Sequence, residues 1–290
     1  MSAPTPISNE GLAQDQGPAS TESLGVAEEE EQGSVASLGA AGLDLFYGAR
    51  DLYSVFVRTL YYTVRGRKEP GSTAAQMYEI GNKSLFFLSC TMGFIGMILV
   101  YQAGLQSRRV VPDFTLLGAT YLELLVRDFA ASIGALMLAT RVGAGIAAEI
   151  GSMVVTEQVD ALRMCAADPI DFLLVPRFKA SIVMTLMVIV WSGTVAFCSG
   201  AATAYFAFDV PLRTFFDARL VDFGDLSIGF TKCIAYGAAI PVVSGYCGLS
   251  TFGGSEGVGW ATTRAVVNTS LAIIMLNFFI SAAGFIIFPG

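Results

Sequence analysis

The sequence predicts an all-α, polytopic membrane protein with five membrane-spanning helices. Its 290 residues have a mean hydropathy of +0.62, and only 14% of them are charged, whereas about 25% is usual for a soluble domain. Long apolar runs in the last two thirds of the chain cause this deficit, and runs of that length indicate helices that cross a hydrocarbon core of about 30 Å. The spans are expected at about residues 85–103, 116–140, 180–206, 226–249 and 265–288.

Two regions differ in composition and define the expected domains. Residues 1–42 are rich in Ser, Ala, Gly, Pro, Glu and Gln and contain no apolar block. We expect them to form a disordered acidic cytoplasmic tail, which is neither a signal peptide nor part of the core. Residues 43–290 are expected to form the membrane domain.

The membrane domain begins with an amphipathic segment at residues 45–68. Tyr53, Phe56 and Leu60 fall on one helical face, and Arg58 falls on the opposite face. With membrane spans following, this pattern favours a helix that lies in the membrane interface. A helix packed on protein has the same pattern, so that alternative stays open.

The composition excludes several kinds of chemistry. The chain has no histidine, which removes the commonest general base and most zinc sites. None of the five cysteines forms a CxxC pair, and we expect them to be small buried side chains. No GxxxxGK[ST] phosphate loop occurs, so the chain is expected to bind no cofactor or metal, and any ATP would be hydrolysed by a partner. The net charge of −7 comes from acids clustered in the tail and does not suggest a nucleic-acid partner.

Basic residues in the short flanks predict the orientation in the membrane. If the N terminus is cytoplasmic, the cytoplasmic side holds most of the Lys and Arg residues, including those from Arg141 to Lys179. The other side holds only Arg108, Arg109, Arg213 and Arg219. Because five spans is an odd number, the C-terminal Gly290 is expected outside.

The longest cytoplasmic connection, residues 141–177, is expected to contain a short amphipathic helix. Ser152 is expected to cap it, and Asp168-Pro169 to end it. Such a helix between two spans suits docking into a groove of a partner protein, although a helix that merely covers the bundle remains an equal alternative. The candidate contact residues in segment 146–168 are Glu149, Thr156, Glu157, Gln158, Asp160 and Leu162.

Two sequence blocks on the cytoplasmic side carry a resemblance to a known family. The first block contains Arg141, Gly143, Ala148-Glu149-Ile150-Gly151, Met153, Thr156-Glu157-Gln158, Asp160-Ala161-Leu162, Asp168-Pro169 and Pro176-Arg177. The second block contains Gly257-Val258-Gly259 and Ala261-Thr262-Thr263-Arg264-Ala265-Val266-Val267. With the span pattern, they resemble the MlaE/YrbE family of ABC-transporter permeases, also called MCE-associated permeases, over about residues 45–288.

The resemblance implies a function and a set of partners. It implies the permease subunit of an ABC transporter that moves phospholipid or another hydrophobic lipid between the bacterial inner membrane and the outer envelope. The permease would be a homodimer in the inner membrane, with its C terminus in the periplasm. The implied partners are an ABC ATP-binding subunit that carries the ATP, an MCE-domain lipid-binding protein and often a small STAS-like protein. An apolar cavity at the dimer seam, lined by spans one, two and five, would suit acyl chains.

Charged residues inside the expected spans form a second candidate site. A charge at the centre of a membrane helix costs about 2.5–3.5 kcal/mol, so these groups must pair or face a polar cavity. Arg127 follows Glu123 at i+4, which favours an ion pair, and Lys232 could reach Asp128 across the bundle. A purely structural charge network is the alternative. The candidate residues of this polar lipid pathway are Glu123, Arg127, Asp128, Lys232 and Asn277.

The chain departs from the family pattern at this second site. After Leu125-Val126-Arg127 the family usually continues with Glu-Leu-Gly-Pro, whereas this chain has Asp128-Phe129-Ala130-Ala131, without the helix-distorting Gly-Pro. An acid is common in the family where this chain has Asn277. Both departures bear on substrate and mechanism, not on the fold.

Two other function classes compete with the permease. A secondary transporter would use Asp128 and Lys232 as a proton relay and would need no ATPase, but the sequence shows no inverted repeat. An intramembrane enzyme would need paired catalytic acids, a histidine or a metal cluster, none of which the sequence suggests.

Overall fold

A computed structural model describes residues 47–48, 50–65, 71–110, 116–217 and 219–287. The expected tail at residues 1–42 lies outside the described residues. Residues Leu52–Gly290 form one structural unit, to which the description below refers. Its described residues are helical or lie in turns and connections, with no strand among them, which confirms the all-α fold class.

Within the described residues, five helical stretches are long and apolar enough to cross a membrane, as the sequence predicts. They are Ser72–Arg109, Leu117–Val155, Ile170–Phe208, Phe223–Leu249 and Gly254–Ile287. Each stretch overlaps one expected span and extends beyond it at one end or both. The extensions arise because polar residues that flank an apolar run continue the helix, whereas the sequence pattern marks only the apolar part.

The long stretches are built from α-helices joined by short π-helical turns. In chain order the elements are α2 (Ser72–Met77), η1 (Tyr78–Asn82), α3 (Lys83–Val110), α4 (Leu117–Leu124), η2 (Leu125–Phe129), α5 (Ala130–Leu138), η3 (Ala139–Gly143), α6 (Ala144–Val155), α7 (Gln158–Met164), η4 (Ile170–Leu174), α8 (Val175–Phe208), α9 (Leu212–Phe215), α10 (Phe223–Leu249) and α11 (Gly254–Ile287). Single π-turns inside α-helices are frequent at functional sites, and η2 contains two of the charged residues expected inside the membrane.

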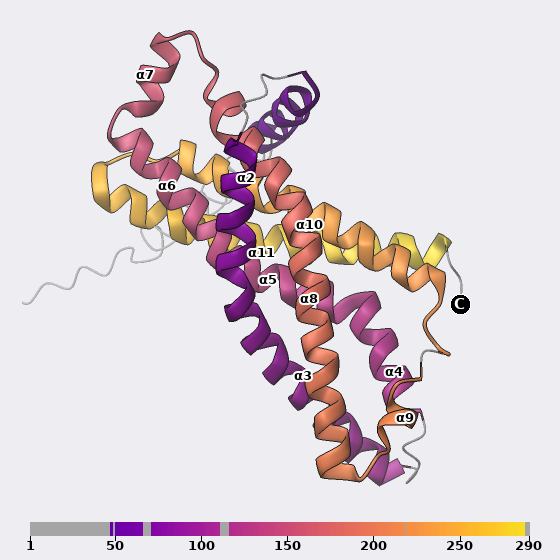
Figure 1. Ribbon diagram of the computed structural model, residues 1–290. Coiled ribbons are helices and arrows are strands. Elements are labelled where there is room, and N and C mark those ends of the chain that lie inside the picture. Colours follow the sequence, from indigo (N-terminus) through magenta and orange to yellow (C-terminus); the bar gives the residue numbers. More distant parts are fainter. Residues whose placement is uncertain (1–46, 49, 66–70, 111–115, 218, 288–290) are drawn as a thin grey trace, which may run out of the picture. The chain divides into compact units, whose positions relative to one another are not determined.

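Helices α3 and α8 run side by side, as do α10 and α11 (Figure 1). The contact between α3 and α8 depends on small residues. A Cβ atom added at Gly96 would lie 2.3 Å from the Ala196 carbonyl oxygen, and one added at Gly200 would lie 2.7 Å from a methyl group of Val100. Such contacts are typical of membrane helices, whose association depends on close van der Waals packing.

Replacing Gly96 by Ala is therefore expected to destabilise the bundle by about 1–3 kcal/mol, the usual cost of overpacking. Gly93, one turn earlier on α3, supplies a matched control, because an added Cβ would meet nothing closer than a Val195 methyl group at 3.7 Å. Thermal unfolding in detergent should show a lower midpoint for Gly96→Ala than for Gly93→Ala. Equal midpoints would contradict the close approach of α3 and α8.

The helix before the first span, residues 52–65, uses a face different from the one that the sequence marks as apolar. Val55 packs against the core, and Thr59 is completely buried. Tyr53 and Leu60 remain 69% and 48% exposed. The helix therefore packs on protein through Val55 and Thr59, and its position in the membrane interface stays a prediction.

Candidate functional site

The first candidate site is the connection between the second and third spans. Helix α6 continues the second span to Val155, and the chain then turns at Thr156 and Glu157, where Glu157 has a left-handed φ of 59°. The short helix α7 follows. The expected helix exists, but its expected start is wrong: Ser152 lies inside α6, and its carbonyl oxygen accepts bonds from the Thr156 backbone amide and hydroxyl.

Helix α7 ends earlier than the sequence suggests. It stops at Met164, and Ala166 follows with a left-handed φ of 57°. Asp168 does not end α7; its carboxylate instead accepts a hydrogen bond of 3.0 Å from the Ile170 amide. Asp168 and Pro169 thus begin the next helical stretch, which is consistent with the preference of Asp for caps and of Pro for the first turn.

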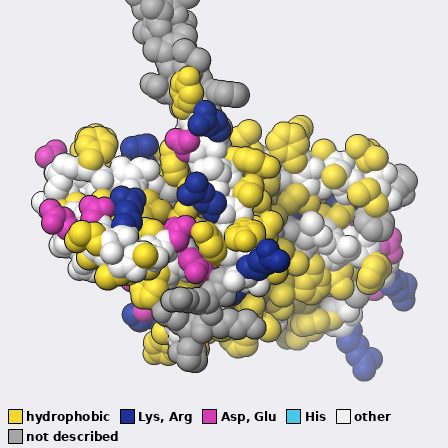
Figure 2. All heavy atoms as spheres, turned by 90° about the horizontal axis from the view of Figure 1, so that it is seen from above, with side chains coloured by type: hydrophobic (Ala, Val, Ile, Leu, Met, Phe, Trp, Pro, Cys, Tyr) yellow, Lys and Arg dark blue, Asp and Glu magenta, His cyan; other side chains and the backbone are white. Residues whose placement is uncertain are grey.

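Helix α7 has one face that packs and one that is open. Val159 is 3% exposed, and Leu162 also packs against the core. On the open face, Asp160 and Arg163 form an exposed ion pair of 3.0 Å, and Met164 is 86% exposed. Figure 1 places α7 at one end of the bundle, and Figure 2 shows acidic and basic side chains gathered among apolar ones on that end.

A buried arginine joins the two helices on either side of this connection. Arg177 on α8 is 3% exposed, and its Nη2 atom lies 2.7 Å from a carboxylate oxygen of Glu149 on α6. The pair joins the two helices that enter and leave the connection. Glu149, an expected partner contact, therefore has an intramolecular role as well, although its side chain is 49% exposed.

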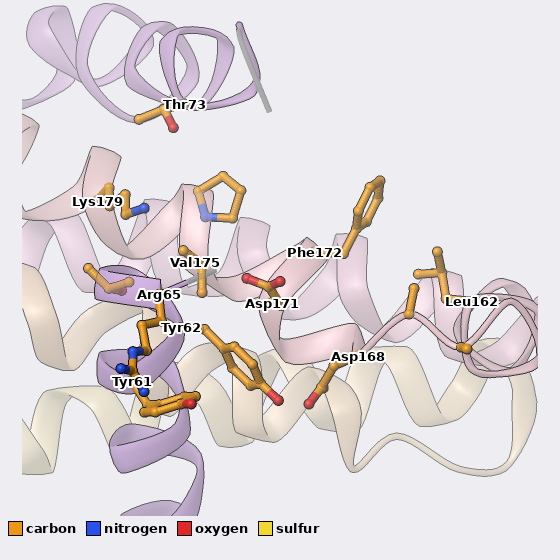
Figure 3. A pocket seen from close by; sticks show the side chains of 14 residues that line it. Tyr61, Tyr62, Arg65, Thr73, Leu162, Asp168, Asp171, Phe172, Val175 and Lys179 are labelled. Atoms are coloured by element: carbon orange, nitrogen blue, oxygen red, sulfur yellow. The ribbon is translucent and has the colours of Figure 1, made fainter. Parts of the chain in front are cut away.

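A pocket of about 1190 Å³ lies beside this connection, between the helix of residues 52–65 and the start of α8 (Figure 3). Within it, the Tyr62 phenol and the Asp168 carboxylate point toward each other. The hydrogen bond that Tyr62 donates to Asp168 raises the pKa of the tyrosine, because the carboxylate stabilises the neutral phenol. Arg65 and Lys179 also line the pocket. Two contacts thus lie at the connection: Arg177 pairs with Glu149, and Tyr62 interacts with Asp168.

The second candidate site lies within the spans, around η2. Lys232 on α10 is 1% exposed, and its Nζ atom lies 2.7 Å from Asp128 Oδ1. The same ammonium group donates a hydrogen bond of 3.2 Å to the Arg127 carbonyl oxygen. The expected contact between Lys232 and Asp128 is therefore present, and it joins α10 to the π-turn of the second span.

The expected ion pair between Glu123 and Arg127 is wrong. Among the described residues Arg127 pairs with Asp225, at 3.3 Å, instead. The reason is the π-turn η2. Its backbone hydrogen bonds span five residues instead of four, so residues four apart, such as Glu123 and Arg127, no longer lie on the same face of the helix. The absence of Gly-Pro in this chain thus does not prevent a local distortion of the helix.

Asn277 also joins the second site. Its side-chain oxygen accepts a hydrogen bond of 3.1 Å from the Tyr236 hydroxyl, on the same helix as Lys232. Asn277 is a neutral amide where an acid is common in the family. The negative charge of Asp128 and the positive charge of Lys232 therefore balance without a further acid at position 277. Four of the five expected intramembrane residues thus take part in polar contacts in this region. Glu123 lies one turn before η2 and forms no ion pair with another described residue.

Two contributors escaped the sequence analysis. Asp225 lay just outside the expected fourth span, yet it belongs to a capping box with Asp222 at the start of α10. That spacing of two acids, three residues apart before an apolar run, is a sequence signal for a helix start. Tyr236 has no comparable signal, because a tyrosine in an apolar helix is more often ordinary packing.

Comparisons with known proteins agree with this architecture. The family described as Permease MlaE matches residues 73–283. A probable ABC transporter permease protein of Synechocystis sp. is 34% identical over 222 residues, which cover 76% of this chain and 84% of the relative. The chloroplastic protein TRIGALACTOSYLDIACYLGLYCEROL 1 of Arabidopsis thaliana is 31% identical over 76% of this chain and 63% of the relative.

A further relative covers more of the chain. The intermembrane phospholipid transport system permease protein MlaE of Haemophilus influenzae is 29% identical over 257 residues, which cover 87% of this chain and 97% of the relative. The family match extends into all five spans and covers the connection with α7 and the charged residues around η2. The chain is therefore a multi-pass membrane protein that belongs to the MlaE permease family.

Proposed function

We propose that this chain is the permease subunit of an ABC transporter that moves phospholipid or another hydrophobic lipid between the inner membrane and the outer envelope. The observation that carries the proposal is α7, a short helix with a charged open face at one end of a bundle of five spans. Relatives named as ABC transporter permeases and as a phospholipid transport permease support it. In this proposal the chain binds no cofactor, and ATP is bound by a separate subunit.

The orientation follows the excess of basic residues on the flanks. The end with α7 faces the cytoplasm, where the ATP-binding subunit is found, and the C terminus faces the periplasm. The residues proposed to contact that subunit are Thr156, Glu157, Gln158, Asp160 and Leu162, with Glu149 at the base. The acids suit charge-assisted contacts with basic residues of the partner.

The protein is further proposed to act as a homodimer. Helix α11 supports this. Only 11% of its most apolar stretch is buried within the protein, whereas 56% of the corresponding stretch of α10 is buried. A second copy would cover part of that surface and enclose an apolar cavity for lipid between spans one, two and five. An MCE-domain protein on the periplasmic side and a small STAS-like protein are the remaining proposed partners.

Purification of the tagged permease from its own host in mild detergent tests the proposal. We expect an ABC ATP-binding subunit to co-purify and to hydrolyse ATP in the eluate. A permease that is folded and pure but carries no ATPase, over a range of detergents, would contradict the proposed coupling.

A further inference from the structure

An apolar groove opens on the surface formed by the second, third and fourth spans. It has a volume of about 290 Å³ and is lined from α4, η2, α5, α8 and α10. We call it the lateral groove; its lining includes Leu122, Ala130, Ile189, Gly193, Leu226 and Phe230. It is separate from the cavity proposed at the dimer seam, because it takes no residue from spans one or five.

Small residues make the lateral groove. A Cβ atom added at Gly193 would lie 3.2 Å from the Ala130 Cβ, and one added at Gly229 would lie 2.6 Å from the Val126 carbonyl oxygen. The three helices therefore approach closely at the floor. Toward the rim, Val190 and Phe230 are 54% and 41% exposed. The groove thus opens to the surroundings of the spans, not to the interior of the bundle.

The lining of the groove is almost free of polar atoms. Among the described lining residues, only Thr194 and Cys233 have a side chain with a polar atom, and the Thr194 hydroxyl donates to the Val190 carbonyl oxygen at 2.9 Å. Water has few partners in such a groove. A void would forfeit the dispersion contacts of its walls, and at membrane depth the abundant apolar filler is the acyl chain of a lipid.

One end of the groove is bordered by the ion pair of Arg127 and Asp225, whose charges balance each other. Arg127 directly follows the lining residue Val126, and its partner Asp225 directly precedes the lining residue Leu226. The Arg127 side chain is 35% exposed, and only its Nη1 atom takes part in the ion pair. Its other nitrogens make no hydrogen bond within the part of the chain that the structure describes. A guanidinium with free donors complements a phosphate group.

We propose that the lateral groove binds a membrane phospholipid, with an acyl chain along the groove and the phosphate near Arg127. The apolar lining accepts the chain, and the charged end selects a phosphate-bearing lipid over a neutral one. Each protomer would then hold a bilayer lipid on the surface of spans two, three and four. The proposal does not depend on the ATPase, so its failure would leave the transport function untouched.

The acyl-chain part can be tested with a photoreactive lipid. The purified permease is placed in nanodiscs of phosphatidylcholine that contain phosphatidylcholine with a diazirine in the middle of one chain, and cross-links are mapped by mass spectrometry. We expect them to concentrate on Val190, Thr194 and Phe230. An even spread over other exposed residues, such as Met187 and Ile234, would overturn the proposal.

Filling the groove supplies the matched comparison. Thr194→Phe should abolish the groove cross-links, whereas Thr231→Phe should keep them. Both threonines are exposed and bond to the carbonyl oxygen four residues earlier, but only Thr194 lines the groove. Val190→Phe, one turn away, repeats the test independently. Groove cross-links that persist in both Thr194→Phe and Val190→Phe would overturn the proposal.

The headgroup part is tested with a diacylglycerol that carries the same photoreactive chain. The wild type should label less with this neutral lipid than with phosphatidylcholine, and Arg127→Gln should remove the difference. Equal labelling of the wild type by both lipids would show that the charged end selects nothing, and the phosphate assignment would be wrong.

Discussion

Replacing both Glu157 and Asp160 by Lys is expected to abolish binding of the ATP-binding subunit while the permease stays folded and in the membrane. Both side chains are exposed, and the pair between Asp160 and Arg163 is solvated on both sides, so the fold loses little. At the interface, losing one partner of a buried charge pair costs about 2–5 kcal/mol, or roughly thirty-fold to several-thousand-fold in affinity. The reversed charges add repulsion.

The measurement is the amount of ATPase that co-purifies, normalised to the yield of permease. Asp209 offers a matched control, because it is also an exposed acid with a left-handed φ, of 53° against 59° for Glu157, and it follows α8 at the end of the bundle away from α7 (Figure 1). Asp209→Lys should bind ATPase as the wild type does, and Glu157→Lys should not. If the double variant co-purified with as much ATPase as the wild type does, the docking surface would have to lie elsewhere.

Reversing either charge of the pair between Lys232 and Asp128 is expected to destabilise the protein strongly. Lys232 is 1% exposed, so Asp128→Lys would place a second ammonium group beside a buried one, and Lys232→Asp would leave two carboxylates facing each other. Breaking a buried pair costs about 3–5 kcal/mol, and we expect the lower end because the Asp128 side chain is 41% exposed. Transport should fall with stability in each single variant.

The swap Asp128→Lys with Lys232→Asp should recover part of the loss. Recovery stays incomplete because an aspartate at position 232 cannot donate to the Arg127 carbonyl oxygen as Lys232 does. A double-mutant cycle from thermal unfolding measures the coupling. The exposed pair of Glu79 and Lys83 is the reference, with an expected coupling of about 0–1 kcal/mol. Additive losses at Asp128 and Lys232 would argue against direct pairing.

The sequence predicts the parts of this protein that depend on its apolar pattern. Five long apolar runs suffice to predict the spans. In the hydrocarbon core the backbone polar groups must bond within the protein, and an α-helix achieves this within one segment. The contact between Lys232 and Asp128 was also foreseeable, since opposite charges inside a bundle must find partners. Local geometry was not foreseeable. The π-turn at residues 125–129 moves Arg127 away from Glu123 and toward Asp225, and no residue in that turn signals it.

Helix ends around α7 show the same limit. Ser152 is a good capping residue by type, but α6 passes through it because the helix still packs there, with Ile150 and Gly151 buried. The true boundary is the left-handed Glu157, a conformation that sequence patterns do not mark for a glutamate. Tertiary packing therefore set this boundary over local preference.

ATP-dependent lipid movement in proteoliposomes tests the central claim most directly. The permease is purified with its co-purifying ATPase and reconstituted with a fluorescent phospholipid, and transfer of that lipid to an acceptor lipid-binding protein is followed with ATP, without ATP, and with an imposed proton gradient. We expect transfer that requires ATP and that is lost when the Glu157 and Asp160 double variant is reconstituted with the ATPase added separately. Transport driven by the proton gradient alone, without ATPase or ATP, would contradict the permease assignment and favour a secondary transporter built on Asp128 and Lys232.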